Sequence, residues 1–273
     1  MKMNKSEIDR FQQLVLGYYA QHGRSLPWRD NPSPYHVLVS EFMLQQTQVE
    51  RVKEKYRAWI ERWPSLTELA HATTAEVVGE WKGLGYNRRA VRLHDTAKRI
   101  MIEFNGEVPK TIEQLITLSG IGKNTAGAIL AYAFNLPVIY IETNIRRVYI
   151  HSFFSDKDKI SDQEILPYIE DSLGRMQPRI WYSALMDYGS NLSRTIVNPN
   201  RRSNHYSRQP RFEGSHRQLR GQILERLLVS PSSKEVLIST YPEFELTQVS
   251  RALDELMREG FLMYEGDSYT MKT

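Results

Sequence analysis

The sequence predicts an all-α protein in which a large helical domain is followed by a small winged-helix-like domain. Signals that start and stop helices recur over residues 1–195, whereas the alternation typical of β-strands is nearly absent before the C-terminal region. That region has the order of three helices and then two short strands, which is typical of a winged helix. We therefore expect a helical domain over 1–195, a basic linker over 196–215 and a winged-helix-like domain over 216–273.

The composition narrows the class of protein. The chain has 273 residues, of which 41% are hydrophobic, enough for a sizeable core. No run approaches the roughly 18 apolar residues of a membrane span, and the N-terminus lacks an apolar signal segment, so we expect a cytoplasmic protein without a membrane partner. The absence of cysteine excludes disulfides, thiol nucleophiles and cysteine-held iron–sulfur clusters.

The helical domain is marked by its caps. Predicted helix starts lie at Ser33 with Pro34 and at the capping-box sequences 65–68, 73–76 and 111–114. Predicted helix ends lie at Gly83, Gly85, Asn105 and Gly106. About ten helices with short loops are expected between residues 5 and 195.

The helix that begins at Pro34 carries an acid on its apolar side. Glu41 follows Val37 by four residues and Leu38 by three, and it precedes Leu44 by three. Burial disfavours the charged form of a carboxyl and so raises its pKa, which is how proteins prepare a general acid or base near neutral pH. A core glutamate satisfied by a nearby arginine is the alternative interpretation.

The stretch LITLSGIGKNTAGAIL, residues 115–130, places two glycines around one isoleucine directly before a small-residue helix. Apolar residues at helical spacing on both sides predict two short helices joined by a tight turn at Gly120 and Gly122. Such a turn leaves the first N–H groups of the second helix without intrahelical partners. With the helix dipole they form a site for an anion, most often a phosphate.

A second acid, Glu142, follows the apolar run 138–141 and precedes the helix openers Thr143 and Asn144. It therefore occupies the mouth of a helix, where an ordinary capping acid is the alternative. Two acids, a phosphate-binding turn and a basic tract are together what breaking an N-glycosidic bond requires. One acid protonates the leaving base, the other faces the oxocarbenium ion, and the protein grips a flipped-out nucleotide.

Beyond residue 192 the composition changes. The formal net charge is +4, and an excess of arginine over 198–220 suggests either a polyanionic partner or a solvated basic linker. Helical periodicity then returns over 217–228, 233–241 and 245–260, and two short strands are predicted around Gly266. The third of these helices would present Gln248, Ser250 and Arg251 to DNA; a helical accessory or dimerisation unit is the alternative.

Residues from about 26 to 189 resemble the helix-hairpin-helix DNA glycosylase superfamily and, within it, the adenine DNA glycosylases of the MutY type. The stretches that carry the resemblance are LPWRDNPSPYHVLVSEFMLQQTQV, EWKGLGYNRRAVRL, LSGIGKNTAGAI, ETNIRRV and ALMDYG. The resemblance implies a two-lobed helical fold and a base-excision-repair enzyme that acts on double-stranded DNA.

The resemblance also implies roles for single residues. Glu41 would protonate the purine at N7, Glu142 would stabilise the cation at C1′ or direct water, and Asn144 would orient it. Residues around the flipped base would be Arg24, Trp28, Arg29, Leu44, Asn124 and Asp187. Residues that wedge into the duplex or hold a phosphate would be Gln46, Tyr86, Gly120, Gly122, Lys123 and Thr125. An alkali cation, Na or K, would lie on the carbonyls of Ile116, Leu118 and Ile121.

Two departures from the family concern chemistry. The family has Asp where this chain has Glu142, and the extra methylene moves the carboxylate by roughly 1.5 Å. A displacement of about 1 Å can cost around a hundredfold in rate unless the backbone compensates. Bifunctional relatives carry a Schiff-base lysine where this chain has Asn124, so we expect hydrolysis without a lyase step.

Two further departures concern DNA binding. The family usually holds an iron–sulfur cluster on four cysteines after the MDYG-like segment, and this chain has none, so we expect no required cofactor. Arg201, Arg202 and Arg208 would take over the phosphate contact by charge. The tail is also too short for the Nudix-like domain that reads 8-oxoguanine in the family.

The resemblance therefore implies a monomeric, nucleoid-associated, monofunctional glycosylase that removes a mispaired base, most readily adenine opposite guanine or 8-oxoguanine. Two alternatives stay open. One is a glycosylase for another base, such as thymine or uracil opposite guanine or a damaged purine. The other is a catalytically impaired protein that binds DNA through its winged helix.

Overall fold

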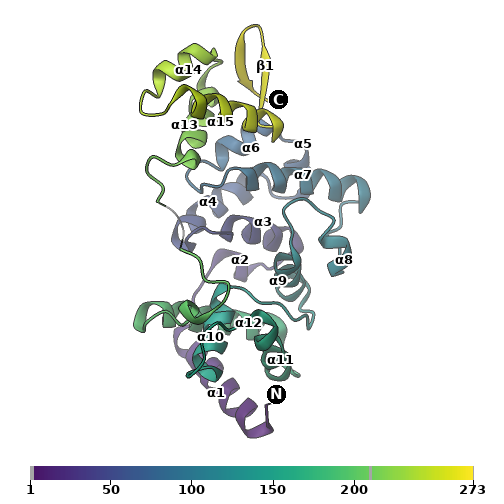
Figure 1. Cartoon of the computed structure of the whole chain (residues 1–273). Coiled ribbons are helices and arrows are strands. Elements are labelled where there is room, and N and C mark those ends of the chain that lie inside the picture. The colour runs from purple at the N-terminus through teal and green to yellow at the C-terminus, as the bar shows by residue number, and fades with distance from the viewer. Residues whose placement is uncertain (1–2, 209–210, 273) are drawn as a thin grey trace. The chain divides into compact units, whose positions relative to one another are not determined.

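The computed structural model describes residues 3–208 and 211–272, and it is almost entirely helical (Figure 1). The helices of the first 195 residues are α1 (Lys5–His22), α2 (Pro27–Asp30), α3 (Pro34–Leu44), α4 (Val49–Arg62), α5 (Leu66–His71), α6 (Thr74–Glu80), α7 (Arg88–Glu103), α8 (Ile112–Leu115), α9 (Lys123–Phe134), α10 (Thr143–Phe153), α11 (Asp162–Leu173) and α12 (Pro178–Thr195). The remaining elements are the 3₁₀ helix η1 (Pro199–Arg202), the helices α13 (His216–Val229), α14 (Lys234–Thr240) and α15 (Leu246–Arg258), and the strands β1 (Leu262–Glu265) and β2 (Ser268–Met271). The prediction of an all-α fold is confirmed.

The predicted caps mark real helix starts. Thr73 forms a reciprocal capping box with Glu76 at the start of α6. Ser65 accepts a hydrogen bond from the amide of Thr67 at α5, and Thr111 caps α8 in the same one-way manner. Twelve α-helices lie between residues 5 and 195 where about ten were predicted, and α2 and α8 have only four residues each. One-turn helices of this kind carry too few residues for periodicity to reveal them.

Backbone contacts divide the chain into two compact units. Among the described residues, unit 1 contains 3–37, 110–117 and 121–208, and unit 2 contains 38–109, 118–120 and 211–272. The C-terminal helices thus belong to the same unit as α4 to α7. The predicted division into a helical domain over 1–195, a linker over 196–215 and a winged-helix-like domain over 216–273 stays a prediction.

The core of unit 1 is built where α1, α10 and α12 pack together. The ring of Phe11 lies 5.2 Å from that of Tyr149 and 5.8 Å from that of Trp181, centroid to centroid. Helices α10 and α12 approach so closely that a Cβ added to Gly189 would lie 2.4 Å from the carbonyl oxygen of Asn144. Only glycine tolerates that approach. The contact fixes the first turn of α10, which carries the predicted site residues.

In unit 2, the buried indoles of Trp59 and Trp81 pack edge to face at 5.5 Å. A hydrophobic core joins α13, α14 and α15 to the antiparallel pair of β1 and β2, in which Leu262 lies opposite Met271. Three helices followed by a hairpin is the order that the sequence predicts, and Figure 1 shows them from α13 in green to β1 in yellow. Across the residues described, no helix combines the length and hydropathy that a membrane crossing requires.

Candidate active site

Glu142 is the N-cap of α10, as its place after a buried segment predicts. Its Oε1 accepts hydrogen bonds from the amides of Asn144 at 2.6 Å and Ile145 at 3.0 Å. Burial raises the pKa of this carboxyl, and the two amide hydrogen bonds and the nearby charge of Arg147 offset only part of that effect. In the part of the chain that is described, both hydrogen bonds of the carboxylate end on Oε1. The other oxygen therefore keeps its acceptor capacity.

Arg147 fixes the side chain next to that acid. Its Nη1 donates to Asn144 Oδ1 at 2.6 Å and to the carbonyl of Gly189 at 2.7 Å, and its Nε donates to Asn198 Oδ1 at 3.1 Å. The residue is only 7% exposed, and burial lowers the pKa of its guanidinium, although the charge of Glu142 acts in the opposite direction. Sequence reasoning did not identify Arg147. Its spacing of three residues from Asn144, on the same face of the helix, is the signal that could have found it.

Three of the residues predicted around the base form one ion-pair cluster in unit 1. Arg29 donates to both oxygens of Asp187 at 2.9 Å, and Arg24 donates its Nε to Oδ1 at 2.7 Å and its amide to Oδ2 at 2.8 Å. Burial alone would raise the pKa of Asp187, but the hydrogen bonds and charges of the two arginines hold it below its usual range. Trp28, between the two arginines in sequence, is buried. The cluster anchors α2 and the residues before it to α12.

Glu41 lies in unit 2, in the last turns of α3. It is partly buried, and its neighbours Ser40 and Phe42 are buried, in agreement with the predicted apolar-side position. Leu44, the last residue of the helix, is also partly buried. Glu41 and Leu44 thus belong to one unit, and Glu142 and Asn144 belong to the other.

The two predicted wedge residues share an unusual backbone. Gln46, in the loop after α3, has a φ of 56°, and Tyr86, in the loop between α6 and α7, has a φ of 49°. Both are in the left-handed region, which costs a non-glycine residue of the order of 1–3 kcal/mol and persists only where the surroundings enforce it. Both loops lie in unit 2.

One buried arginine, Arg89, donates hydrogen bonds to both of these loops. Arg89, at the start of α7, is 6% exposed. Its guanidinium donates to the carbonyl oxygens of Phe42, Met43, Gln45, Leu84 and Gly85 and to Thr47 Oγ1. Burial lowers its pKa to about 10. Sequence reasoning did not identify Arg89, because nothing in the pattern distinguishes it from Arg88, which is exposed.

The glycine turn has the predicted form. Gly120 has a φ of 82°, and a Cβ there would lie 2.9 Å from Phe42 Cε1 and 3.1 Å from Arg92 Cβ, so the position admits only glycine. Gly122 is the N-cap of α9 in an extended conformation, with open space where a Cβ would be. Lys123 and Asn124 are exposed on the first turn of that helix, and Thr125 is partly buried. The alkali cation on the carbonyls of Ile116, Leu118 and Ile121 stays a prediction.

Residues 198–207 lie where the family usually holds its iron–sulfur cluster, and hydrogen bonds connect them to α10. Asn200 Nδ2 donates to the carbonyl of Thr143 at 2.9 Å. Arg202 donates to the carbonyls of Ser155 at 2.6 Å, Ile150 at 3.3 Å and Phe154, which are at the C-terminal end of α10. With no cysteine in the chain, these residues do not fit a cluster. No group of three or more His, Asp or Glu side chains suited to a metal occurs in the described ranges.

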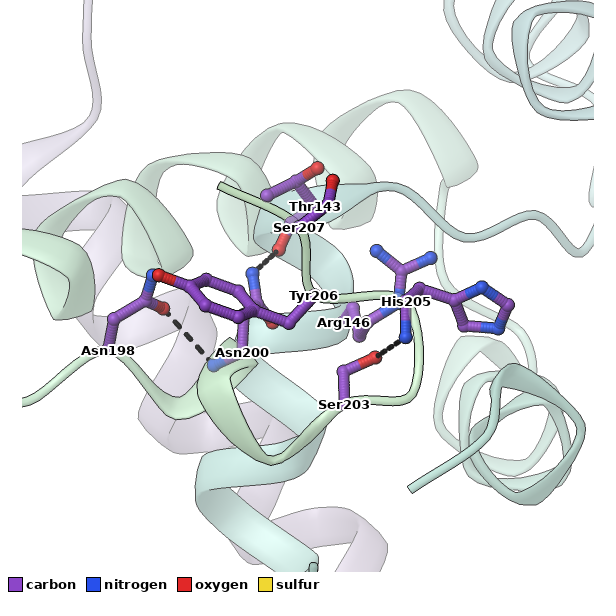
Figure 2. A pocket seen from close by; sticks show the side chains of 8 residues that line it. All are labelled: Thr143, Arg146, Asn198, Asn200, Ser203, His205, Tyr206 and Ser207. Carbon is purple, nitrogen blue, oxygen red and sulfur yellow. Dashed lines mark hydrogen bonds between the residues drawn. The ribbon is translucent and has the colours of Figure 1, made fainter. Parts of the chain in front are cut away.

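This segment and α10 also line an open polar pocket of about 290 Å³ (Figure 2). The residues that line it are Thr143, Arg146, Asn198, Asn200, Ser203, His205, Tyr206 and Ser207. Arg146 is held by a two-point ion pair with Asp162, at 2.6 and 2.7 Å. Of the three arginines predicted to contact phosphate, Arg202 caps α10, whereas Arg201 and Arg208 are exposed.

Comparisons with known proteins identify the family of the chain. The profile of the HhH-GPD superfamily, described as base excision DNA repair protein, matches residues 39–171. The adenine DNA glycosylase of Mycolicibacterium smegmatis is 34% identical over 93% of this chain and 92% of its own length. The adenine DNA glycosylase of Mycobacterium tuberculosis is 46% identical over 49% of this chain and 44% of its own. The human adenine DNA glycosylase is 34% identical over 72% of this chain and 37% of its own.

Solved structures share the fold at lower identity. A thermostable thymine-DNA glycosylase superposes with a TM-score of 0.60 and 22% identity, covering 68% of this chain and 87% of that one. Endonuclease III in a non-covalent complex with DNA gives a TM-score of 0.54 and 18% identity, covering 71% and 87%. Because one relative matches nearly the whole length of both chains, this protein belongs to the adenine DNA glycosylase family of helix-hairpin-helix base excision repair proteins.

Proposed function

We propose that this protein is a monofunctional DNA glycosylase that hydrolyses the N-glycosidic bond of adenine mispaired with guanine or 8-oxoguanine. The observation that carries the proposal is the arrangement at the start of α10. There the carboxyl of Glu142 is held by two amides beside an asparagine whose own orientation is fixed by Arg147. A carboxylate with this support can face a developing positive charge without reorganising.

The extra methylene of Glu142 has a physical compensation. Because Oε1 accepts from the amides of Asn144 and Ile145, the longer side chain is folded back onto the first turn of its own helix. The carboxylate is therefore held close to the backbone, as a shorter acid would be. This supports a working acid at a position where the family has Asp.

In the proposed reaction Glu41 donates a proton to the departing base while the bond from C1′ to nitrogen breaks. Glu142 stabilises the cation at C1′ or directs the attacking water, and Asn144 orients that water. The base would lie near Leu44, Trp28 and the cluster of Arg24, Arg29 and Asp187. Asn124 supplies no amine for a Schiff base, so hydrolysis ends the reaction.

DNA binding is proposed to use charge and backbone amides. The exposed start of α9 at Gly122, with Lys123 and Thr125, would hold a phosphate of the damaged strand. Gln46 and Tyr86 would fill the gap left by the flipped base. The protein would work as a monomer on nucleoid DNA, with no required cofactor.

The test is base release from duplexes with adenine opposite 8-oxoguanine or guanine. Wild-type protein is expected to produce abasic sites, and E41Q is expected to be slower by about 10²- to 10⁴-fold, because general acid catalysis contributes that much. Equal product from both proteins would remove the assignment. The exposed Asn124 departs from the adenine branch, so duplexes with thymine or uracil opposite guanine belong in the same panel. Duplex binding without release of any base would identify a non-catalytic protein.

A further inference from the structure

The C-terminal domain, α13 to β2, is built onto the helices that flank the Tyr86 loop. Val78 of α6 is 3% exposed and belongs to the same hydrophobic core as Leu219, Ile223 and Leu253. Val91 of α7 packs against that core as well. Since α6 and α7 lead into and out of the loop 81–87, the domain is part of the support of that loop.

Two ion pairs add to this contact at the surface. Lys82 Nζ lies 3.6 Å from Glu225 Oε1, and Arg88 Nε lies 3.6 Å from Glu259 Oε2. Glu259 is itself held by Arg220 at 2.6 Å. The two basic residues lie on either side of Tyr86 in the sequence. The C-terminal domain therefore contacts the chain before and after the wedge residue.

The domain also reaches the wedge residue itself. Arg217, in the first turn of α13, donates a hydrogen bond from Nη1 to the hydroxyl of Tyr86. Its guanidinium carbon lies 5.1 Å from the centroid of the Tyr86 ring, and that of Arg89 lies 5.7 Å away. Both distances are within the range of a cation–π contact. Two arginines, Arg89 from α7 and Arg217 from α13, thus act on the same ring.

In α15, the helix expected to read DNA, the three predicted side chains form contacts within the helix and its cap. Gln248 completes a capping box with Glu245, the hydroxyl of Ser250 donates to the carbonyl of Leu246 at 2.8 Å, and Arg251 pairs with Glu255 at 2.9 Å. The three side chains proposed for base reading are therefore engaged within α15. The contact that links the C-terminal domain to a predicted DNA residue comes from α13.

We propose that Arg217 is a positioning residue through which the C-terminal domain sets the ring of Tyr86 for insertion into the duplex. The inference rests on the proposed function. Holding the hydroxyl and the ring face of Tyr86 removes rotamer freedom before DNA binds, so less entropy is lost when the ring stacks between bases. The domain then takes part in mispair recognition by orienting the wedge.

A double-mutant cycle of R217Q and Y86F tests the proposal. The readouts are the single-turnover rate of adenine release and the fluorescence of 2-aminopurine placed at the target position, which reports unstacking of the base. R217Q is expected to lower both by about tenfold with an unchanged melting temperature, and R217K, which keeps the charge, is expected to recover part of the loss. Adding Y86F to R217Q should cost little more, because both remove the same contact.

The matched control is R226Q, in the same helix, since Arg226 bonds to Ser230 and lies outside the Tyr86 contact. It should leave the rate and the fluorescence unchanged. Additive losses in the cycle, faster release in R217Q, or an equal loss in R226Q would overturn the inference while wild-type activity stands. A wild-type protein that releases no base from any duplex of the panel would overturn the proposed function and the inference together.

Discussion

At the scale of single residues, Glu142 combines two tasks that can be separated. Its carboxyl caps α10 through two amide hydrogen bonds, and we assign it the charge that faces C1′. Glutamine keeps an acceptor oxygen for the amides but carries no charge. The free energy of unfolding of E142Q should therefore lie within about 1 kcal/mol of the wild-type value, because most of the cap remains. E142Q should release adenine at least about a hundredfold more slowly, because the charge that faces C1′ is gone. Thermal melting and single-turnover kinetics check the two parts, and full activity in E142Q would reduce Glu142 to a cap.

The buried His94 should make the free energy of unfolding depend on pH. It is 3% exposed in α7, its Nε2 has no hydrogen-bond partner among the described residues, and burial together with the charge of Lys98 lowers its pKa to about 4. The unfolded chain binds this proton near pH 6.5 and the folded chain only near pH 4, so the free energy of unfolding should fall as pH drops between those values.

The check is the melting temperature measured across that pH range in wild type and in H94L, which has no titrating group at this position. The wild-type curve should slope downward toward pH 4 and the variant curve should be flatter. Two parallel curves would mean that His94 does not carry the effect.

At the scale of elements, Arg89 should decide whether the two wedge loops stay formed. R89K keeps the charge but cannot reach the carbonyls of both loops, which leaves buried acceptors without donors, each at a cost of about 1–3 kcal/mol. We expect a loss of about 3 kcal/mol or more in the free energy of unfolding and weaker duplex binding by the protein that remains folded.

The control for Arg89 is R179K in unit 1. Arg179 donates to the carbonyls of Tyr132 at 2.6 Å and Ala133 at 2.9 Å. The R179K substitution therefore also removes guanidinium hydrogen bonds to carbonyl oxygens. It should lower the melting temperature and leave duplex affinity at low temperature unchanged. Comparable binding defects in both variants would show that lost stability, rather than loop geometry, explains the effect.

The basic segment after α12 gives a second prediction at this scale. Arg201 and Arg208 are exposed, whereas Arg202 is engaged with the end of α10. Replacing Arg201 and Arg208 with Gln should weaken duplex binding and reduce the slope of log K against log salt by about 0.9 for each phosphate that is no longer neutralised. R202Q should mainly lower the melting temperature. Affinity titrations at several salt concentrations check this, and an unchanged slope in the double variant would refute the binding of phosphate by these two arginines.

Much at the element scale could be predicted from the sequence, because caps, glycine turns and periodicity are local signals. The helix start at Thr73, the left-handed Gly120 and the position of Glu142 at a helix mouth all follow from a few neighbouring residues. The buried arginine Arg89 could not be predicted. Its partners are mostly backbone carbonyl oxygens, which every residue has, so no side-chain pattern records the pairing. The position of Arg147, three residues after Asn144, is a local signal for one of its contacts, but its contact with Asn198 lies too far along the chain for such a signal.

At the scale of the whole molecule, the contact between Arg217 and Tyr86 joins residues 131 positions apart. Sequence periodicity identifies α13 as a helix but not what it packs against. The winged-helix order predicts a C-terminal domain that reads DNA, and this stays a prediction. The contacts group residues 211–272 with 38–109 and 118–120. The shared core around Val78 is the physical reason for this grouping.

That shared core makes a prediction about truncation. A chain that ends at residue 215 would expose Val78, which is 3% exposed in the full protein, together with the apolar side chains of α6 and α7 that pack beside it. Exposing a buried apolar side chain costs about 1.5–3 kcal/mol, so the truncated protein should melt at a lower temperature and release adenine more slowly. The surface variant E225Q is the control, because exposed ion pairs such as that of Lys82 contribute at most about 1 kcal/mol. Melting curves and adenine release rates of the truncated, E225Q and full-length proteins check this prediction. A truncated protein as stable and as active as the full chain would mean that residues 216–273 do not support Tyr86.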